Sequence, residues 1–149
     1  MAGLTQKEQL LLKDQQSHEK LCIAKYQQYA AQTSDTELAQ LFSDYAQQEV
    51  NHLNTINKHL NQSSSNPDPQ DSEDQSNQGQ AGFLSGSSDA ELCEDMLITE
   101  KYVSNTYDTA VFEADDSTLR QDLSHIQKEE QQHGEGIYNY MKNKGYYQA

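Results

Sequence analysis

Two Glu-x-x-His pairs, Glu49 with His52 and Glu130 with His133, are the residues in this sequence best suited to chemistry. A spacing of three places both side chains of a pair on the same face of a helix. Carboxylate oxygen and imidazole nitrogen together suit divalent iron or manganese. One such pair alone is weak evidence, because most are solvated surface pairs. Two pairs in matching positions favour a metal site.

The chain also repeats itself after 81 residues. The shift superposes the following residues: Asp14 on Asp95, Glu19 on Glu100, Tyr26 on Tyr107, Glu49 on Glu130 and His52 on His133. In each half, a lone glutamate (Glu19 or Glu100) precedes the glutamate of the pair by 30 residues. Such a repeat predicts two copies of one helical hairpin, with all six groups at one height of a four-helix bundle.

These six residues fall on predicted core lines, whose members recur at spacings of three and four. The four lines are Leu12, Gln15, Glu19, Cys22, Tyr26 and Tyr29; Leu38, Phe42, Tyr45, Glu49, His52, Ile56 and His59; Cys93, Met96, Glu100, Val103, Tyr107 and Ala110; and Leu119, Leu123, Ile126, Glu130, His133, Ile137 and Tyr140. Four buried carboxylates repel one another or take up protons, unless two divalent cations balance them. The alternative is a relic site, partly protonated or hydrogen-bonded, that binds no metal.

Four helices are expected, near residues 6–32, 36–60, 89–113 and 117–143, because 5–60 and 89–133 contain neither proline nor glycine. Helix starts are predicted at three capping boxes and one acidic turn, and a stop at a glycine. These signals are Thr5 with Glu8, Ser34 with Glu37, Ser88 with Glu91, Asp115-Asp116-Ser117, and Gly145. The sequence therefore predicts an all-α fold built from two antiparallel hairpins.

Residues 61–88 contain both prolines, four acidic residues and no basic residue, which predicts a disordered acidic linker. Without it, the low hydrophobic fraction of 34% is less unusual. A length of 149 residues suits one domain, 1–149, with hairpin 1 at about 5–60 and hairpin 2 at about 89–145. The linker is long enough to cross the whole bundle.

The net charge of −14 argues against nucleic acid and anionic membranes as partners. No apolar run is long enough for a membrane span, and the first residues lack the pattern of a signal peptide, so secretion by that route is not expected. Cys22 and Cys93 lie far apart in sequence and are expected to be two buried thiols in a reducing compartment.

Tyr26 and Tyr107 each lie one heptad beyond a lone glutamate, on the same core line. They either pack in the core with satisfied hydroxyls, or hydrogen-bond a metal ligand or pass an electron during O₂ chemistry. His18 lies off the core line and is expected at the surface, while His59 and His125 have no recognisable partner.

The second half of the sequence, from AELCEDMLITEKYVSNTYDTA through QDLSHIQKEEQQHGEGIYNYMKNKGYYQ, resembles the spore coat F family of endospore-forming bacteria. Its ending, Lys144-Gly145-Tyr146-Tyr147-Gln148, is similar to that family's ending. The resemblance implies a ferritin-like fold, synthesis in the mother-cell cytoplasm and deposition on the spore coat. The wider ferritin-like resemblance implies that Glu19, Glu49, His52, Glu100, Glu130 and His133 bind two ions, Fe or Mn.

Two functions fit this sequence. The first is a spore coat-associated ferritin-like protein with a di-iron or di-manganese carboxylate site, whose partners are other coat proteins or further copies of itself. The second is a di-metal redox enzyme without a structural coat role, such as a peroxide-scavenging, catalase-like enzyme or a ferroxidase, whose substrate is O₂ or peroxide. Iron storage in a hollow shell is a weaker third reading, because no sequence feature indicates a cage.

Overall fold

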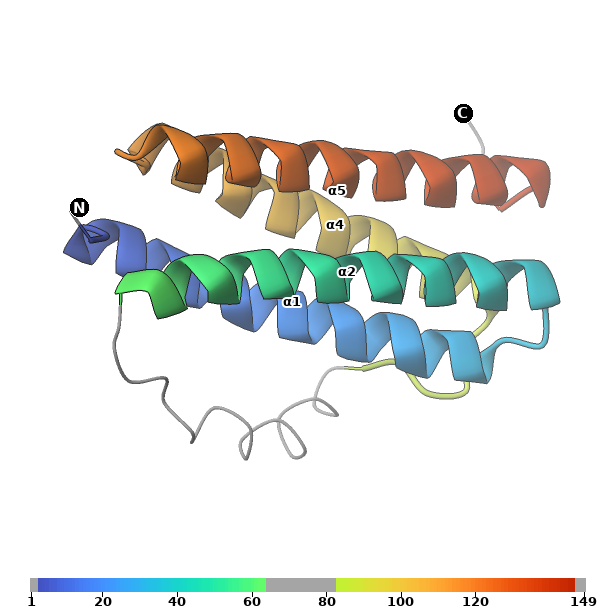
Figure 1. Cartoon of the computed structure of the whole chain (residues 1–149). Coiled ribbons are helices and arrows are strands. Elements are labelled where there is room, and N and C mark those ends of the chain that lie inside the picture. Colours follow the sequence, from blue (N-terminus) through green and yellow to red (C-terminus); the bar gives the residue numbers. More distant parts are fainter. Residues whose placement is uncertain (1–2, 64–82, 147–149) are drawn as a thin grey trace.

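The computed structural model describes residues 3–63 and 83–146, and these ranges contain four helices and no strand. The helices are α1 (Gln6–Gln32), α2 (Thr36–Ser63), α4 (Asp89–Glu113) and α5 (Ser117–Asn143). They run along a common long direction as antiparallel neighbours (Figure 1). Among the described helices, none is long and apolar enough to cross a membrane. The predicted all-α, four-helix bundle is confirmed.

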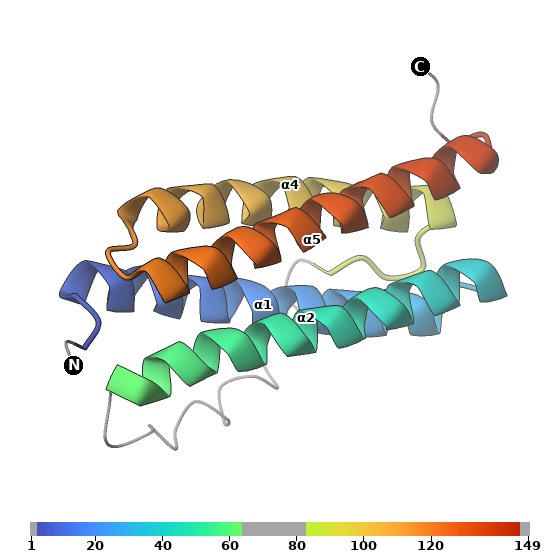
Figure 2. The same cartoon turned by 45° about the horizontal axis from the view of Figure 1, so that its top comes forward.

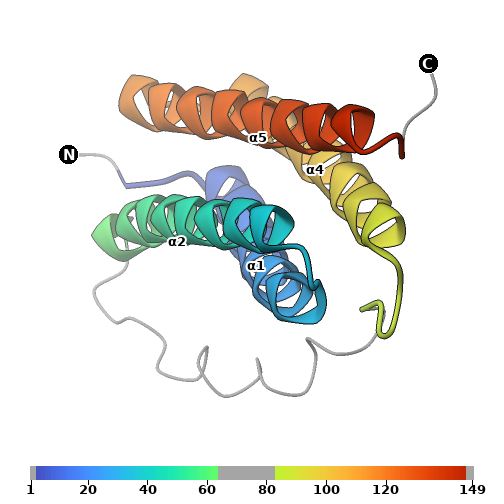
Figure 3. The ribbon, with the colours of Figure 1, turned by 90° about the vertical axis from the view of Figure 1, so that its right-hand side faces the viewer.

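Each hairpin is a closely packed helix pair, α1 with α2 and α4 with α5. Figure 2 shows the two pairs as two layers, and Figure 3 shows them from one end of the bundle. The layers are joined mainly through contacts of α1 with α4, and less closely through α2 and α5. The end of α2 and the beginning of α4 lie at opposite ends of the bundle (Figure 1), as a long crossover requires.

The helix starts follow the predicted capping chemistry with one correction. Thr5 with Glu8 and Ser88 with Glu91 form complete capping boxes. At α2 the helix begins at Thr36 as predicted, but the predicted cap, Ser34, is replaced by its neighbour Asp35, whose carboxylate accepts from the Glu37 backbone N–H at 3.0 Å. An Asp carboxylate caps a helix as well as a Ser hydroxyl and also interacts favourably with the helix dipole, so Asp35 is a suitable cap.

The two remaining signals also hold. Asp116 caps α5 by accepting from the Leu119 backbone N–H at 2.9 Å. Gly145 follows the end of α5 with φ of +76°, a left-handed conformation that favours glycine.

The boundaries of the predicted linker differ from the observed ones. Helix α2 continues to Ser63, three residues past the predicted end at 60. Residues 83–88 are described and contact α1, since the Leu84 backbone N–H donates to the Tyr29 hydroxyl at 3.0 Å and the Leu84 carbonyl accepts from Gln32 Nε2 at 2.7 Å. The rest of the predicted disordered linker, 64–82, lies outside the described residues.

Candidate metal centre

The bundle buries the six sequence-predicted ligands at its centre. Glu19 comes from α1, Glu49 and His52 from α2, Glu100 from α4, and Glu130 and His133 from α5, and every one of them is at most 2% exposed. They lie between apolar layers formed by the same core lines. The i, i+3 and i, i+4 spacing therefore places these polar groups inward, as the sequence predicts.

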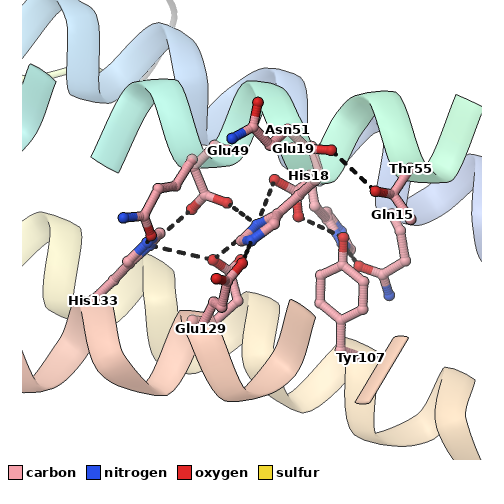
Figure 4. Close-up of polar contacts among 12 residues, drawn as sticks. Gln15, His18, Glu19, Glu49, Asn51, Thr55, Tyr107, Glu129 and His133 are labelled. Carbon is pink, nitrogen blue, oxygen red and sulfur yellow. Dashed lines mark hydrogen bonds and ion pairs between the residues drawn. The ribbon is translucent and has the colours of Figure 1, made fainter. Parts of the chain in front are cut away.

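The six residues form two overlapping groups that could each hold one cation. One group is Glu19, Glu49, His52 and Glu130, and the other is Glu49, Glu100, Glu130 and His133; within each, one atom per residue lies within 4.8 Å of all the others. Glu49 and Glu130 belong to both groups, whereas each lone glutamate and each histidine belongs to one. Figure 4 shows Glu49 pointing toward His133 across the bundle.

Both histidines present Nδ1 to the carboxylates. His52 Nδ1 lies 2.7 Å from Glu49, 3.5 Å from Glu130 and 3.7 Å from Glu19. His133 Nδ1 lies 3.2 to 3.5 Å from Glu49, Glu100 and Glu130. The two rings are nearly parallel, with centroids 6.0 Å apart. This places one ring nitrogen in each four-residue group.

The four buried carboxylates accept fewer hydrogen bonds than their oxygens could. Five of their buried oxygens have no hydrogen-bond partner: Glu19 Oε1, Glu49 Oε2, Glu100 Oε1 and both oxygens of Glu130. A buried charged oxygen without a partner is costly, and a divalent cation removes that cost. The donor set of oxygens with one nitrogen per group suits Fe or Mn. The residues present therefore fit a pair of divalent cations.

The titration of the cluster is shifted in the direction expected for metal-free carboxylates in close proximity. Burial, with the charges of Glu19 and Glu100, raises the pKa of Glu49 well above its usual range. Burial, with the charges of Glu100 and Glu49, does the same to the pKa of Glu130. The raised pKa values mean that a cation would compete with protons for these two carboxyls.

The histidines are shifted toward their charged form. Burial lowers the pKa of His52, but the carboxylates of Glu19 and Glu130 outweigh burial and raise it to about 9. Burial likewise lowers the pKa of His133, and Glu100 with Glu130 raises it to about 9. The negative charge of the cluster therefore favours the protonated form of both histidines when metal is absent.

The tyrosines contact the cluster across the bundle. The Tyr26 hydroxyl from α1 donates to Glu100 Oε2 of α4, and the Tyr107 hydroxyl from α4 donates to Glu19 Oε2 of α1. Both rings are fully buried. Figure 4 shows Tyr107 beside the cluster. The two readings left open by the sequence are both partly met, because each ring packs in the core while its hydroxyl binds a candidate ligand.

The hydrogen-bond acceptors of the two histidine Nε2 atoms were not predicted from the sequence. His52 Nε2 lies 2.7 Å from Glu129 Oε1, and His133 Nε2 lies 2.7 Å from Gln48 Oε1. Since both partners are acceptors, each Nε2 carries a proton, and Nδ1 is the nitrogen that would lose its proton to bind a cation. The 81-residue repeat superposes Gln48 on Glu129, which was the signal that could have found them.

A tyrosine was missed as well. Tyr45 stacks on His133, with ring centroids 4.2 Å apart. It lies on the predicted core line of α2, where its spacing does not distinguish it from an ordinary packing residue.

The other titratable candidates lie away from the centre. His59 is buried and pairs with Asp122 at 2.7 Å, and His125 Nε2 lies 3.5 Å from Glu129 Oε2, which corrects the expectation that these two histidines have no partner. His18 is half-buried rather than fully at the surface and packs edge-on against Tyr102. Cys22 and Cys93 are free, buried thiols, as predicted.

Comparison with known proteins finds a family match for the second hairpin. No curated protein matches the sequence. Residues 88–149 match the model of the Coat F domain, a range that begins at the Ser88 cap of α4 and includes all of α5. A Coat F domain indicates a spore coat protein. The second hairpin of this chain therefore matches the Coat F domain, which confirms the resemblance to the spore coat F family.

Proposed function

We propose that this protein is a spore coat component whose bundle binds two divalent cations, Fe or Mn, at the six central residues. The observation that carries the proposal is the set of five buried carboxylate oxygens without partners, arranged in two groups that each include a histidine nitrogen. A purely structural bundle gains nothing from these groups, because apolar side chains of similar volume would be more stable there.

In this proposal the residues have distinct roles. Glu49 and Glu130 belong to both groups and would be available to either ion, Glu19 and Glu100 would each hold one, and His52 and His133 would each supply Nδ1. The fold resembles the ferritin-like class, in which this ligand pattern holds di-iron or di-manganese centres. Such a pair of ions supplies redox chemistry with O₂ or peroxide.

The protein side chains prepare the site for that chemistry. The core lines above and below the cluster exclude bulk water, which strengthens each electrostatic contact inside. Tyr26 and Tyr107 hold Glu100 and Glu19 in place through their hydroxyls. A small oxidant is the substrate class that suits a buried centre. Removal of peroxide at the coat would be compatible with a structural coat role, so the two functions need not exclude each other.

Metal analysis of the purified protein tests the proposal. After chelation and reloading with Fe(II) or Mn(II), we expect two ions per chain and measurable consumption of peroxide. Glu94→Gln, at an exposed position on α4, is the matched control for loss of one carboxylate and should retain both ions. A protein that stays empty in excess Fe(II) and Mn(II) would show that the cluster is a protonated relic and leave only the coat role.

A further inference from the structure

The two histidines differ in the group that accepts from their outer nitrogen. His52 Nε2 donates to a carboxylate, Glu129, and His133 Nε2 donates to a neutral amide, Gln48, each at 2.7 Å. The two acceptors occupy equivalent positions of the 81-residue repeat, each four residues before a histidine of its own helix. The geometry of the two contacts is therefore the same, and their charge is not.

A carboxylate acceptor makes an imidazole a stronger ligand than an amide acceptor does. It draws the Nε2 proton toward itself, which raises the electron density and basicity at Nδ1. It also adds a negative charge near any cation bound there. Glu129 is only 29% exposed, so water weakens this effect only partly.

We propose that the two cation sites are unequal, and that the site containing His52 binds the first ion more tightly because Glu129 supports its ligand. The site containing His133 then fills second. This inference rests on the proposed function, since it concerns the same two sites. It adds an order of binding, and it assigns Glu129 and Gln48 as the positioning residues that set this order.

Another asymmetry lies beside the same histidines and must be separated from this one. Tyr45 stacks on His133, whereas the repeat places Ile126 at the equivalent position in the other hairpin. The stacked ring leaves the charge of the Nε2 acceptor unchanged. Exchanging only residues 48 and 129 therefore separates the two effects, because Tyr45 is retained.

The test is a titration of the metal-free full chain with Zn(II), followed by ¹⁵N NMR of the histidine rings. Zn(II) is diamagnetic and binds imidazole nitrogen and carboxylate oxygen. The variants His52→Asn and His133→Asn identify the two ring signals. In the native protein we expect the first equivalent to shift the His52 signal and the second to shift that of His133.

Three isosteric variants then decide the cause. Glu129→Gln should weaken the first site about 10- to 100-fold, measured by competition with a chelator. Gln48→Glu should strengthen the second site by a similar factor. The exchange Gln48→Glu with Glu129→Gln keeps the net charge constant and should reverse the order, so that His133 responds first. Circular dichroism checks that each variant remains helical.

The outcomes distinguish the inference from the function on which it rests. If the exchange variant fills in the native order, or if Glu129→Gln leaves the first affinity unchanged, the inference is wrong while the metal centre stands. If neither histidine signal responds to Zn(II) in the native protein, the proposed centre itself is wrong and the inference falls with it. Reversal of the order supports both.

Discussion

The first hairpin and the second supply equivalent ligands to the centre, yet they surround those ligands with different residues. The repeat superposes every candidate ligand on its own kind, and the same holds for the two cross-bundle tyrosines. Around them the pairs differ: Gln48 with Glu129, Tyr45 with Ile126, Cys22 with Val103, and Thr55 with Gly136. Binding of two cations would explain why the candidate ligands are the same in both halves, because each buried carboxylate is costly without a cation. The residues around them need only fill space in the core, so they can differ.

Removing one carboxylate at a time is the strongest test of whether the two hairpins supply equivalent groups to two cation sites. Glu49 and Glu130 belong to both cation groups, so Glu49→Leu or Glu130→Leu should abolish binding of both ions. Glu19→Leu and Glu100→Leu should each lose one ion and retain the other, because each glutamate belongs to one group. Elemental analysis of the reloaded proteins measures this stoichiometry. A Glu19→Leu protein that lost both ions would contradict the division into two groups.

The pH dependence of stability in the metal-free protein tests whether the histidines of the two hairpins are equivalent. The pKa of His52 and of His133 rises from 6.5 to about 9 on folding, so the stability that each contributes is complete below about pH 6.5 and is lost as pH rises toward 9. The pKa values of Glu49 and Glu130 are also raised, so their effect has the same sign. Each histidine can contribute on the order of 3 kcal/mol.

Thermal unfolding between pH 6 and pH 9 measures this effect. The melting temperature of the chelated protein should fall by several degrees with increasing pH. The metal-loaded protein should lose this trend, because deprotonated ligands bind metal more tightly. His52→Gln and His133→Gln should each reduce the slope by a similar amount, since the two shifts are equal. A metal-free protein whose stability rises over this range would contradict the shifted pKa values.

The fold and the burial of the six candidate ligands were predictable because they depend on local rules. Capping boxes at Thr5 and Ser88 and the spacing of core residues fix the helices and their inward faces. The Glu-x-x-His spacing then fixes what those faces carry. Contacts that cross the bundle were not predictable, since they depend on helix rotation and rotamer. Glu129 is the main example, because nothing in its own helix indicates that it accepts from His52.

A third test compares the two tyrosines that cross the bundle. Tyr26→Phe and Tyr107→Phe each remove the hydroxyl that donates to a buried oxygen, Glu100 Oε2 or Glu19 Oε2. Each should destabilise the metal-free protein by about 1–3 kcal/mol. The loss should be larger for Tyr107→Phe, because Glu100 Oε2 keeps its contact with His133 Nδ1 at 3.2 Å. Urea unfolding measures both losses, and equal losses would show that the His133 contact does not compensate for the missing hydroxyl.

The smallest expected effect concerns a position where the hairpins differ, Gly136, which the 81-residue repeat superposes on Thr55. A Cβ at Gly136 would overlap the Tyr45 hydroxyl, so Gly136→Ala must displace the ring that stacks on His133. Overpacking costs about 1–3 kcal/mol, and better helix propensity returns about 1 kcal/mol, which leaves a net loss of about 1 kcal/mol. Gly134→Ala is the matched control on the same helix, because its Cβ would meet only Leu97, at an ordinary 3.7 Å. It should be neutral or slightly stabilising.

The Tyr45→Phe background identifies the cause of any loss. It removes the hydroxyl that the Gly136 Cβ would overlap and keeps the ring that packs on His133. In this background Gly136→Ala should lose most of its cost and approach Gly134→Ala, as urea unfolding of the four proteins would measure. If Gly136→Ala destabilises the Tyr45→Phe protein as much as the native one, the Tyr45 hydroxyl is not the group that the new Cβ overlaps. If the destabilisation disappears, a glycine in the second hairpin makes room for a tyrosine of the first, and this difference between the halves reflects complementary packing.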